Sequence, residues 1–300
     1  LCDGVNTYNQ TGFQYAIQQI IIMKRRILLA ISLWLIFTIH LSAQTFSIMT
    51  WNIQDLDRTK TDDEIEMMAE VMKNYDIIAV QEVVGTDYAG AQKVALIADY
   101  LNRKGSRWDY KLSDRTDSPS PYIAERYAFF WKPSRVTLKN DPYLDKDLKD
   151  ECDREPYIAR FQPRGSNESF YVISFHARRF DNHPDEEIKH FVNYPQRLKT
   201  NQFFIVGDFN LDEKHEVWQP FYAKGFVSAI QDKPTTLKRK CDRKDDYFNY
   251  PIDNIYFHSE RFENVESGRV DFVLDCKNLE IARGVSDHLP VYVKVKMISP

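Results

Sequence analysis

The sequence is poor in cysteine and arranges none of it as a metal site. Four cysteines occur in 300 residues. They form no Cys-x-x-Cys pair and no Cys/His cluster, which argues against a structural zinc site. Cys2 lies in the N-terminal stretch, so Cys152, Cys241 and Cys276 remain for the folded part. This odd number allows one disulfide and one free thiol, and the sequence does not choose the pair.

An excess of basic charge is also missing. Lys and Arg number 40 against 44 Asp and Glu, a formal net charge of -4. This balance gives no hint of a polyanionic partner. It does not exclude one, because metal ions and a local basic strip can still meet phosphate groups on a mildly acidic protein.

Repeats, low-complexity tracts and linkers are absent from residues 44–300. Hydrophobic residues make up 43% of the chain and charged residues 28%, as in an ordinary globular protein. The 17 Tyr, 19 Phe and 5 Trp supply large apolar surfaces, which argues against disorder. Residues 44–300 are therefore expected to form a single domain.

One long apolar run stands near the N-terminus. Met23-Lys24-Arg25-Arg26 is basic, residues 27–41 are almost wholly apolar, and Leu41-Ser42-Ala43 ends in small residues. This order predicts a secretory signal peptide over 23–43, cleaved after Ala43, and a secreted or periplasmic protein. The alternative is a membrane anchor, but a run of about 15 residues is shorter than the ~20 that span a bilayer. Residues 1–22 read as an upstream extension.

Strand-like and helix-like segments alternate along residues 44–300. Period-two apolar spacing predicts a strand at 46–51, and the apolar run 77–80 predicts a strand covered on both sides. Helices are predicted after the cap Thr61, over 89–102 ending at Gly105, and from Pro184. Further strands are expected at 127–131, 170–174, 203–206, 252–257 and 291–295.

Polar side chains cluster at the ends of these strands. They are carboxylates, amides and imidazoles, namely Asn52, Glu82, His176, Asp208, Asn210, Asp287 and His288. Strand ends of this kind can deliver their groups to one rim of a sheet. Turns alone are a poor explanation for so many polar residues of these types at strand ends.

The same residue types suit the hydrolysis of a phosphodiester. That reaction needs a cation for the phosphoryl oxygens, a base for water and a proton source for the leaving oxygen. Hard oxygen ligands for Mg²⁺ or Ca²⁺ are available in Asn52, Glu82, Asp208, Asn210 and Asp287. His176 and His288 are candidates for the acid and base, with Glu125 and Asp253 as carboxylates that orient them.

Each residue alone has a plainer explanation. Asp208 and Asn210 can be turn residues, and Glu82 a solvated charge. His176 can be a half-buried ring, and Glu125 a rim charge paired with an arginine. The joint occurrence of all these residues in this order favours the catalytic interpretation.

The ordered motifs resemble the endonuclease/exonuclease/phosphatase superfamily over essentially all of residues 44–300. The motifs are Thr50-Trp51-Asn52-Ile53, Val80-Gln81-Glu82-Val83, Ser174-Phe175-His176, Gly207-Asp208-Phe209-Asn210, Asp253-Asn254-Ile255 and Ser286-Asp287-His288-Leu289-Pro290. Two further stretches, Tyr122–Tyr127 and Cys152–Pro156, resemble deoxyribonuclease I in particular. The resemblance implies an α/β fold of two packed mixed β-sheets flanked by helices, a four-layer sandwich.

The resemblance also implies roles for these residues. Glu82 would be a principal metal ligand with Asn52 nearby, and Asp208, Asn210 and Asp287 would complete the metal and phosphate site. His176 with Glu125 and His288 with Asp253 would be the two acid/base pairs, with base and acid left unassigned. The implied cofactor is Mg²⁺, or Ca²⁺ or Mn²⁺, and the implied products are 5′-phosphate and 3′-hydroxyl ends.

One departure concerns DNA binding. Deoxyribonuclease I carries an arginine two positions after the strand glutamate that enters the minor groove, and here that position is Val84. Tyr122 remains as a groove-stacking residue, with Arg115 in compensation. Arg154, and Arg178 with Arg179, are then expected to contact phosphates, so that binding weakens as salt is added. The alternative for Arg178-Arg179 is a solvated loop.

The interpretation that follows is a secreted, metal-dependent endonuclease acting on duplex DNA with low sequence specificity. It is expected to be a monomer without stable membrane association. The same motifs would serve a phosphodiesterase for sphingomyelin or a phosphoinositide phosphatase. A non-catalytic binding module would be expected to have lost some of the catalytic groups, yet all are present.

Overall fold

A computed structural model describes residues 18–27, 45–86, 88–244 and 246–298. The chain divides into two units, Leu1–Ala43 and Gln44–Pro300, and each is described on its own. In the first unit, residues 18–27 are helical. The rest of the expected extension and signal peptide, residues 1–17 and 28–43, lies outside the described residues. Within the described parts of the chain, no helix combines the length and apolar character needed to cross a membrane.

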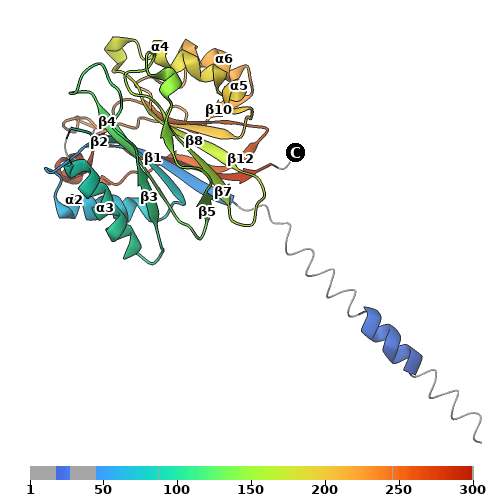
Figure 1. The fold of residues 1–300 in the computed structure, drawn as a ribbon. Helices are drawn as coiled ribbons and strands as arrows, with labels where there is room; N and C mark the ends of the chain where they lie inside the picture. The colour runs from blue at the N-terminus through green and yellow to red at the C-terminus, as the bar shows by residue number, and fades with distance from the viewer. Residues whose placement is uncertain (1–17, 28–44, 87, 245, 299–300) are drawn as a thin grey trace, which may run out of the picture. The chain divides into compact units, whose positions relative to one another are not determined.

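The second unit is built on two β-sheets, which Figure 1 shows packed face to face. Over residues 45–86, 88–244 and 246–298, the first sheet has six strands in the order β12 (Phe262–Arg269), β13 (Val291–Met297), β1 (Thr45–Leu56), β2 (Ile77–Val84), β4 (Glu125–Trp131) and β3 (Asp109–Leu112). Only β1 and β2 run parallel in it. The first sheet is therefore mixed.

The second sheet has seven strands within the same described ranges. Six follow the order β10 (Phe226–Ser228), β11 (Asp253–His258), β9 (Phe203–Asp208), β8 (Phe170–His176), β7 (Tyr157–Pro163) and β5 (Val136–Leu138), and β6 (Tyr143–Leu144) pairs with β7. Here β8 and β9 are the parallel pair. Two packed mixed sheets confirm the fold class expected from the sequence.

Helices cover the outer faces of the sheets (Figure 1). Those beside the first sheet are α2 (Asp62–Met72), α3 (Ala89–Asn102) and α7 (Leu279–Val285), and those beside the second are α4 (Asp185–Ile188), α5 (Tyr194–Leu198) and α6 (Gln219–Tyr222). Short 3-10 turns lie at η1 (Lys146–Leu148), η2 (Phe180–Asn182), η3 (Lys189–Asn193), η4 (Glu216–Trp218) and η5 (Cys276–Asn278). This arrangement gives the four layers.

Apolar side chains fill each interface between layers. Between the sheets, Phe46 stacks on Phe170 with ring centroids 4.4 Å apart, and Phe204 packs edge-on against both. A second cluster lies between the first sheet and α2 and α3, and a third between the second sheet and its helices. Burial of this much aromatic surface is what fixes the two sheets against each other.

The predicted helix start at Thr61 is confirmed. The Thr61 hydroxyl accepts a hydrogen bond from the Glu64 backbone N–H at 3.3 Å, and the Glu64 carboxylate accepts one from the Thr61 N–H at 2.7 Å. This reciprocal pair is a capping box. The buried face of α2 consists of Ile65, Met68, Ala69 and Met72, which follow the spacing of an amphipathic helix.

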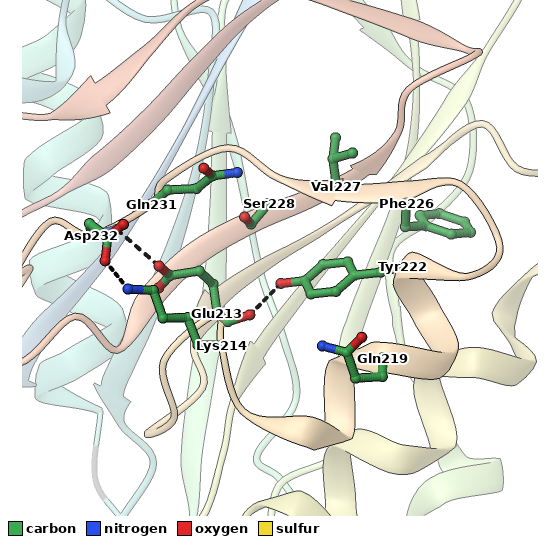
Figure 2. Close-up of a pocket in the computed structure, with 9 residues that line it drawn as sticks. All are labelled: Glu213, Lys214, Gln219, Tyr222, Phe226, Val227, Ser228, Gln231 and Asp232. Carbon is green, nitrogen blue, oxygen red and sulfur yellow. Dashed lines mark hydrogen bonds and ion pairs between the residues drawn. The ribbon is translucent and has the colours of Figure 1, made fainter.

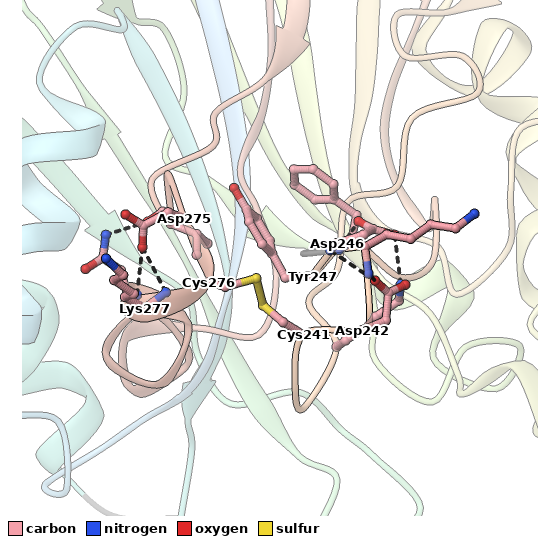
Figure 3. The surroundings of a disulfide bond; sticks show 12 residues. Cys241, Asp242, Asp246, Tyr247, Asp275, Cys276 and Lys277 are labelled. Carbon is pink, nitrogen blue, oxygen red and sulfur yellow. Dashed lines mark hydrogen bonds and ion pairs between the residues drawn. A yellow bond between two sulfur atoms is a disulfide. The ribbon is translucent and has the colours of Figure 1, made fainter.

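The structure also settles the cysteines. Cys241 and Cys276 form a disulfide, with Cα atoms 6.0 Å apart, and Cys152 is a buried thiol. Figure 3 shows the disulfide joining the loop before Tyr247 to the segment that leads into α7. Of the pairings that the sequence left open, the structure therefore has Cys241 with Cys276.

Candidate active site

One row of the second sheet carries three of the predicted site residues. In the ladders, His176 at the end of β8 lies beside Asp208 at the end of β9, and Asp253 at the start of β11 lies on the other side of Asp208. Parallel pairing of β8 with β9 places their carboxyl ends at one edge, and antiparallel pairing brings the start of β11 to that same edge. The sheet topology alone therefore juxtaposes an imidazole and two carboxylates.

Gly207 makes this close approach of β8 and β9 possible. Its φ is 145°, and a Cβ built there would lie 1.8 Å from the carbonyl oxygen of Phe175. No side chain can be accommodated at that distance. The glycine before Asp208 is thus required by the packing of the strand that presents the carboxylate.

The first sheet supplies the facing groups through bulges. The β1–β2 ladder shifts register after Asn52, and the β2–β4 ladder shifts between Val80 and Val83. Glu82 stands in the second irregularity with φ 61°, in the left-handed region. Bulges re-aim a side chain next to a site, and a non-glycine residue at such a φ is strained. Here the strain turns the Glu82 carboxylate toward the end of β9.

Hydrogen bonds join the two sheets at this point. The Asn52 amide Nδ2 donates to Glu82 Oε1 at 2.7 Å and to Asp208 Oδ2 at 3.1 Å. The Asn52 Oδ1 accepts the backbone N–H of Gln54. Asn52 therefore bridges the two carboxylates as a donor, and its own oxygen is engaged elsewhere.

Two histidines are each held by a carboxylate. His176 Nδ1 lies 2.9 Å from Glu125 Oε2, and His288 Nδ1 lies 2.9 Å from Asp253 Oδ2. In both pairs the partner fixes the tautomer and leaves Nε2 to face the site. The Nε2 atoms converge on Asp208 Oδ2, at 3.6 Å from His176 and 3.7 Å from His288.

Electrostatics keep the first pair ionised. Burial disfavours the charged form of Glu125, but His176 and Arg154 outweigh it and hold the pKa of Glu125 below its usual range. Burial likewise opposes a charged His176, yet Glu125 raises the pKa of that imidazole. Glu82 has less compensation, and burial raises its pKa.

The second pair behaves similarly. Burial raises the pKa of Asp253 to about 6, although His288 works against this rise. The pKa of His288 is lifted well above its usual range, because Asp253 and Asp208 together outweigh its burial. Both imidazoles can therefore carry a proton at the edge of a strongly anionic site.

Two hydroxyl groups that sequence reasoning missed support His288 and Asp253. The Thr235 hydroxyl donates to Asp253 Oδ2 at 2.7 Å and accepts from the Asp253 N–H at 3.0 Å. The Ser286 hydroxyl donates to the Asn52 carbonyl at 2.7 Å and accepts the His288 N–H at 2.9 Å. Thr235 precedes Asp253 by 18 residues, and only the fold brings them together.

The donor set fits a hard divalent cation. Within the described residues, ligand atoms of Asp208, Asp253 and His288 lie within 4.8 Å of one another. Glu82 and Asp208 share one amide, and no Lys or Arg side chain bonds to either of them in the described contacts. Carboxylate oxygens that no lysine or arginine side chain neutralises are the ligands that Mg²⁺ or Ca²⁺ prefers.

The pattern of paired histidines and carboxylates agrees with a match to known sequences. The sequence profile of the Endonuclease/Exonuclease/phosphatase family matches residues 49–288. The chain belongs to this family.

Relatives support the assignment. Deoxyribonuclease gamma of Homo sapiens is 26% identical over 291 residues, covering 89% of this chain and 91% of its own. A deoxyribonuclease of Thioalkalivibrio sp. (strain K90mix) is 28% identical over 81% of this chain and 69% of its own. The structure of D. rerio TDP2 complexed with single strand DNA product has a TM-score of 0.58 and 16% identity, covering 84% of this chain and 99% of that one. At that identity the likeness concerns the fold.

A cavity of about 490 Å³ opens beside His288, one of the candidate catalytic groups. His288, Asp287 and Asn210 form one wall. Asp287 is held by the Gln54 side chain at its N–H and lies 3.6 Å from the Arg283 guanidinium. Asn210 has φ 52° and donates from its amide to the Ala177 carbonyl at 3.2 Å. These two predicted residues therefore lie at the mouth of the site and not at its centre.

The residues predicted to bind DNA have different surroundings. Tyr122 is 95% exposed in the turn before β4, and Arg115 is exposed with its stem against Gly85. The Arg154 side chain is only 13% exposed, because its Nε lies 3.0 Å from Glu125 Oε2. Arg154 therefore neutralises Glu125, and only a small part of its side chain is exposed to solvent.

Arg178 and Arg179 have different surroundings in the structure. Arg178 Nε lies 2.8 Å from Asp153 and 3.2 Å from Glu187, so its charge is matched by one carboxylate from a loop and one from α4. Arg179 is 74% exposed and lines the cavity beside His288. Of the two, Arg179 is the more exposed, and within the described residues it has fewer carboxylate partners.

A larger cavity, of about 530 Å³, lies elsewhere on the second sheet (Figure 2). In it the Asp232 N–H donates to Glu213, and the Tyr222 hydroxyl donates to the Glu213 carbonyl at 2.6 Å. Neither His176 nor His288 lines this cavity. The convergence of titratable groups, and not cavity size, is what distinguishes the candidate active site here.

Proposed function

We propose that the chain hydrolyses phosphodiester bonds of DNA as a divalent-metal-dependent endonuclease with low sequence specificity. The observation that carries this proposal is the convergence of two carboxylate-held imidazoles on Asp208, with 3.6 and 3.7 Å to the shared oxygen. Acid and base groups placed on two sides of one point suit a displacement at phosphorus.

The proton transfers follow from this geometry. One Nε2 takes a proton from water as its oxygen bonds to phosphorus, and the other gives a proton to the departing 3′ oxygen as the P–O bond breaks. The products are a 5′-phosphate and a 3′-hydroxyl, with one water consumed. Glu125 and Asp253 hold the rings and stabilise the protonated forms.

A divalent cation completes the charge balance. Glu82 and Asp208 would hold it, with Asp287 at the mouth of the site. Mg²⁺ is the first candidate, with Ca²⁺ or Mn²⁺ as alternatives, because all these donors are oxygen atoms. When bound, it neutralises the phosphoryl oxygens.

DNA is proposed as the substrate because the relatives named above are deoxyribonucleases. Tyr122 and Arg115 are exposed, Arg179 lines the cavity beside His288, and Arg154 contacts Glu125 of the site. Contacts of this kind act on phosphates and sugar, so affinity should fall with salt and vary little with sequence. We take the active form to be a monomer of residues 44–300.

Export is part of the proposal. Residues 23–43 have the order of a signal peptide. The Cys241–Cys276 disulfide fits an oxidising compartment, where such bonds persist. Secretion or release into a periplasm would separate the nuclease from the cell's own chromosome.

Nicking of supercoiled plasmid tests the function. The full chain is incubated with plasmid in Mg²⁺ with Ca²⁺, and separately with a chelator. Nicked circles are expected only with metal. His176→Ala should abolish nicking, whereas His215→Ala, a histidine that caps η4 outside the site, should retain it.

Two results would contradict the proposed function. A fully active His288→Ala or His176→Ala protein contradicts the mechanism. Intact plasmid in every lane, with a folded protein, contradicts DNA as substrate. Sphingomyelin and phosphoinositides would then be tested, because the same pairs of residues suit those phosphodiesters and phosphates.

A further inference from the structure

The cavity beside His288 has two aromatic residues at its rim. Phe180 is 69% exposed and Tyr250 is 61% exposed, and both line the cavity together with Ile252 and Leu237. These two exposed rings line the same cavity as His288 and are not part of the hydrophobic core. Such a grouping marks a place for a ligand with a flat apolar surface.

Tyr250 is held rigidly despite its exposure. Its N–H donates to the Thr236 hydroxyl at 2.8 Å, and its carbonyl accepts from the Thr235 N–H at 2.7 Å. Thr235 is the residue that holds Asp253, and Thr236 pairs with His288 in an isolated bridge. The backbone that carries the ring is therefore fixed relative to Asp253 and His288, which lowers the entropy cost of placing the ring against a ligand.

Phe180, the second aromatic residue at the rim, belongs to a different segment of the chain from Tyr250. Phe180 begins the 3-10 turn η2 that follows β8, and Arg179 precedes it with 74% exposure. A guanidinium next to an aromatic ring offers both a stacking face and a charge for a phosphate. This combination suits a nucleotide better than a purely apolar ligand.

A basic hairpin leads away from the cavity. Leu237 pairs with Phe248 at its base, and the disulfide at Cys241 ties it to the segment before α7. Four of its basic residues are exposed, namely Arg239, Lys240, Arg243 and Lys244. Exposed basic side chains of this kind suit contacts with the phosphates of a nucleic acid strand.

We propose that this cavity binds one unpaired nucleobase of the substrate strand next to the scissile phosphate, with the base stacked against Tyr250 and Phe180. The proposal rests on the proposed hydrolysis of DNA. A base inside a duplex cannot enter a pocket unless it leaves the stack. The cavity volume of about 490 Å³ lies within the range of small-ligand sites.

Strand preference follows from this site. Single-stranded or locally opened DNA presents its bases at no unpairing cost, so it should be bound better than intact duplex. Val84, which is half buried in the β2–β4 ladder, offers no charged contact to a groove. The structure therefore favours recognition of an exposed base over recognition of a groove.

Binding tests the proposal apart from catalysis. The full chain carrying His176→Ala is titrated, in Mg²⁺, into three labelled DNAs of equal length, and fluorescence anisotropy is measured. They are a single strand of thymidines, the same backbone with abasic tetrahydrofuran residues, and a duplex. The single strand should bind about tenfold more tightly than the abasic backbone, as expected for one stacked base.

Variants locate the effect. Tyr250→Ala on the same background should remove the preference for bases, and Tyr250→Phe should keep it. Tyr143→Ala, at an exposed tyrosine on β6, is the matched control and should also keep it. Thermal unfolding of each variant confirms that it is folded, and Phe180→Ala replaces Tyr250→Ala if that chain is not.

The outcomes separate the two proposals. Equal binding of the thymidine strand and the abasic backbone overturns the nucleobase site, as does a base preference that survives both Tyr250→Ala and Phe180→Ala. Base-selective binding without plasmid nicking by the unmodified chain would retain the nucleobase site and reject hydrolysis of DNA.

Discussion

The disulfide between Cys241 and Cys276 should contribute a large share of the stability of the nuclease unit. The proposed perturbation is the double substitution Cys241→Ser/Cys276→Ser. The bond closes a loop with a sequence separation of 35. Loop closure of that length lowers the entropy of the unfolded chain by about 13 cal/mol/K, or about 4 kcal/mol at 25 °C. Removal of the bond should therefore lower the free energy of unfolding by about that amount.

Thermal unfolding measures the effect. For a unit of this size, each 1 kcal/mol shifts Tm by about 2–4 °C, so the double variant should melt about 8–16 °C lower. The unmodified chain in a reducing agent should melt at the same temperature as the variant. The double variant itself should not respond to the reducing agent, because Cys152 is a buried thiol with no partner to lose.

Activity should respond less than stability. The contacts that place Asp253 and His288 come from Thr235, Thr236 and Ser286, and none of them depends on the disulfide. Well below its Tm, the reduced protein should therefore nick plasmid at close to the oxidised rate. A Tm unchanged by reduction would refute the loop-closure reasoning, and loss of activity without loss of Tm would refute the independence of the site.

Two further predictions concern the site itself. Thr235→Val removes a hydroxyl that bonds to Asp253 and to the Ile252 and Asp253 N–H groups, so unfolding in urea should show a loss of at least about 2 kcal/mol. The same variant should lower kcat by about 10- to 100-fold with little change in KM, since a group that orients a catalytic residue has been lost; a kcat equal to that of the unmodified chain would contradict this role. Millimolar Mg²⁺ should raise the Tm of the unmodified chain by mass action, and Glu82→Gln should reduce that rise. An equal rise in both proteins would place the cation elsewhere.

Much of the fold can be inferred from the sequence because its strongest signals are local. Thr61 and Glu64 are three residues apart, so a capping box is visible in the sequence before any tertiary contact is known. The apolar run at β2 and the polar ends of β8 and β9 are equally local. Four of the strands that the sequence left unpredicted, β3, β5, β6 and β10, are short and at sheet edges or off the main path, where pairing rather than composition decides the structure. The longer strands β7 and β12 were also left unpredicted.

The residues of the candidate site also differ in whether a local motif marks them in the sequence. His176, Asp208 and Asp253 stand at strand ends and carry recognisable motifs, and the structure brings them together. Thr235 and Tyr250 carry none, because a threonine and a tyrosine in a loop are ordinary residues until the fold bonds Thr235 to Asp253 and brings Tyr250 into the cavity that His288 lines. The pairing of Cys241 with Cys276 was open for the same reason, since it depends on where two loops meet.

The division between Arg178 and Arg179 shows why neighbouring residues of one type cannot be separated by sequence. Arg178 has carboxylate partners from residues 153 and 187, which are 25 and 9 positions away. Arg179 has only its exposed neighbour Asp181 among the described ion pairs. The prediction of a phosphate contact therefore moves from Arg178 to Arg179, on the ground that a charge already matched by buried carboxylates has little left for a ligand.

Asp208 is where the constraints of both sheets meet. Its Oδ1 accepts the Asn210 N–H, and its Oδ2 accepts the Asn52 amide and lies near both imidazoles. An asparagine here would turn a donor toward the Asn52 Nδ2 and toward two rings that can carry protons. The carboxylate is thus needed twice, once to join β9 to β1 and once to hold positive charge at the point of reaction. That double use explains why Gly207 is tolerated in a central strand: a closer approach of β8 to β9 is worth the loss of a side chain when it places this oxygen between two histidines.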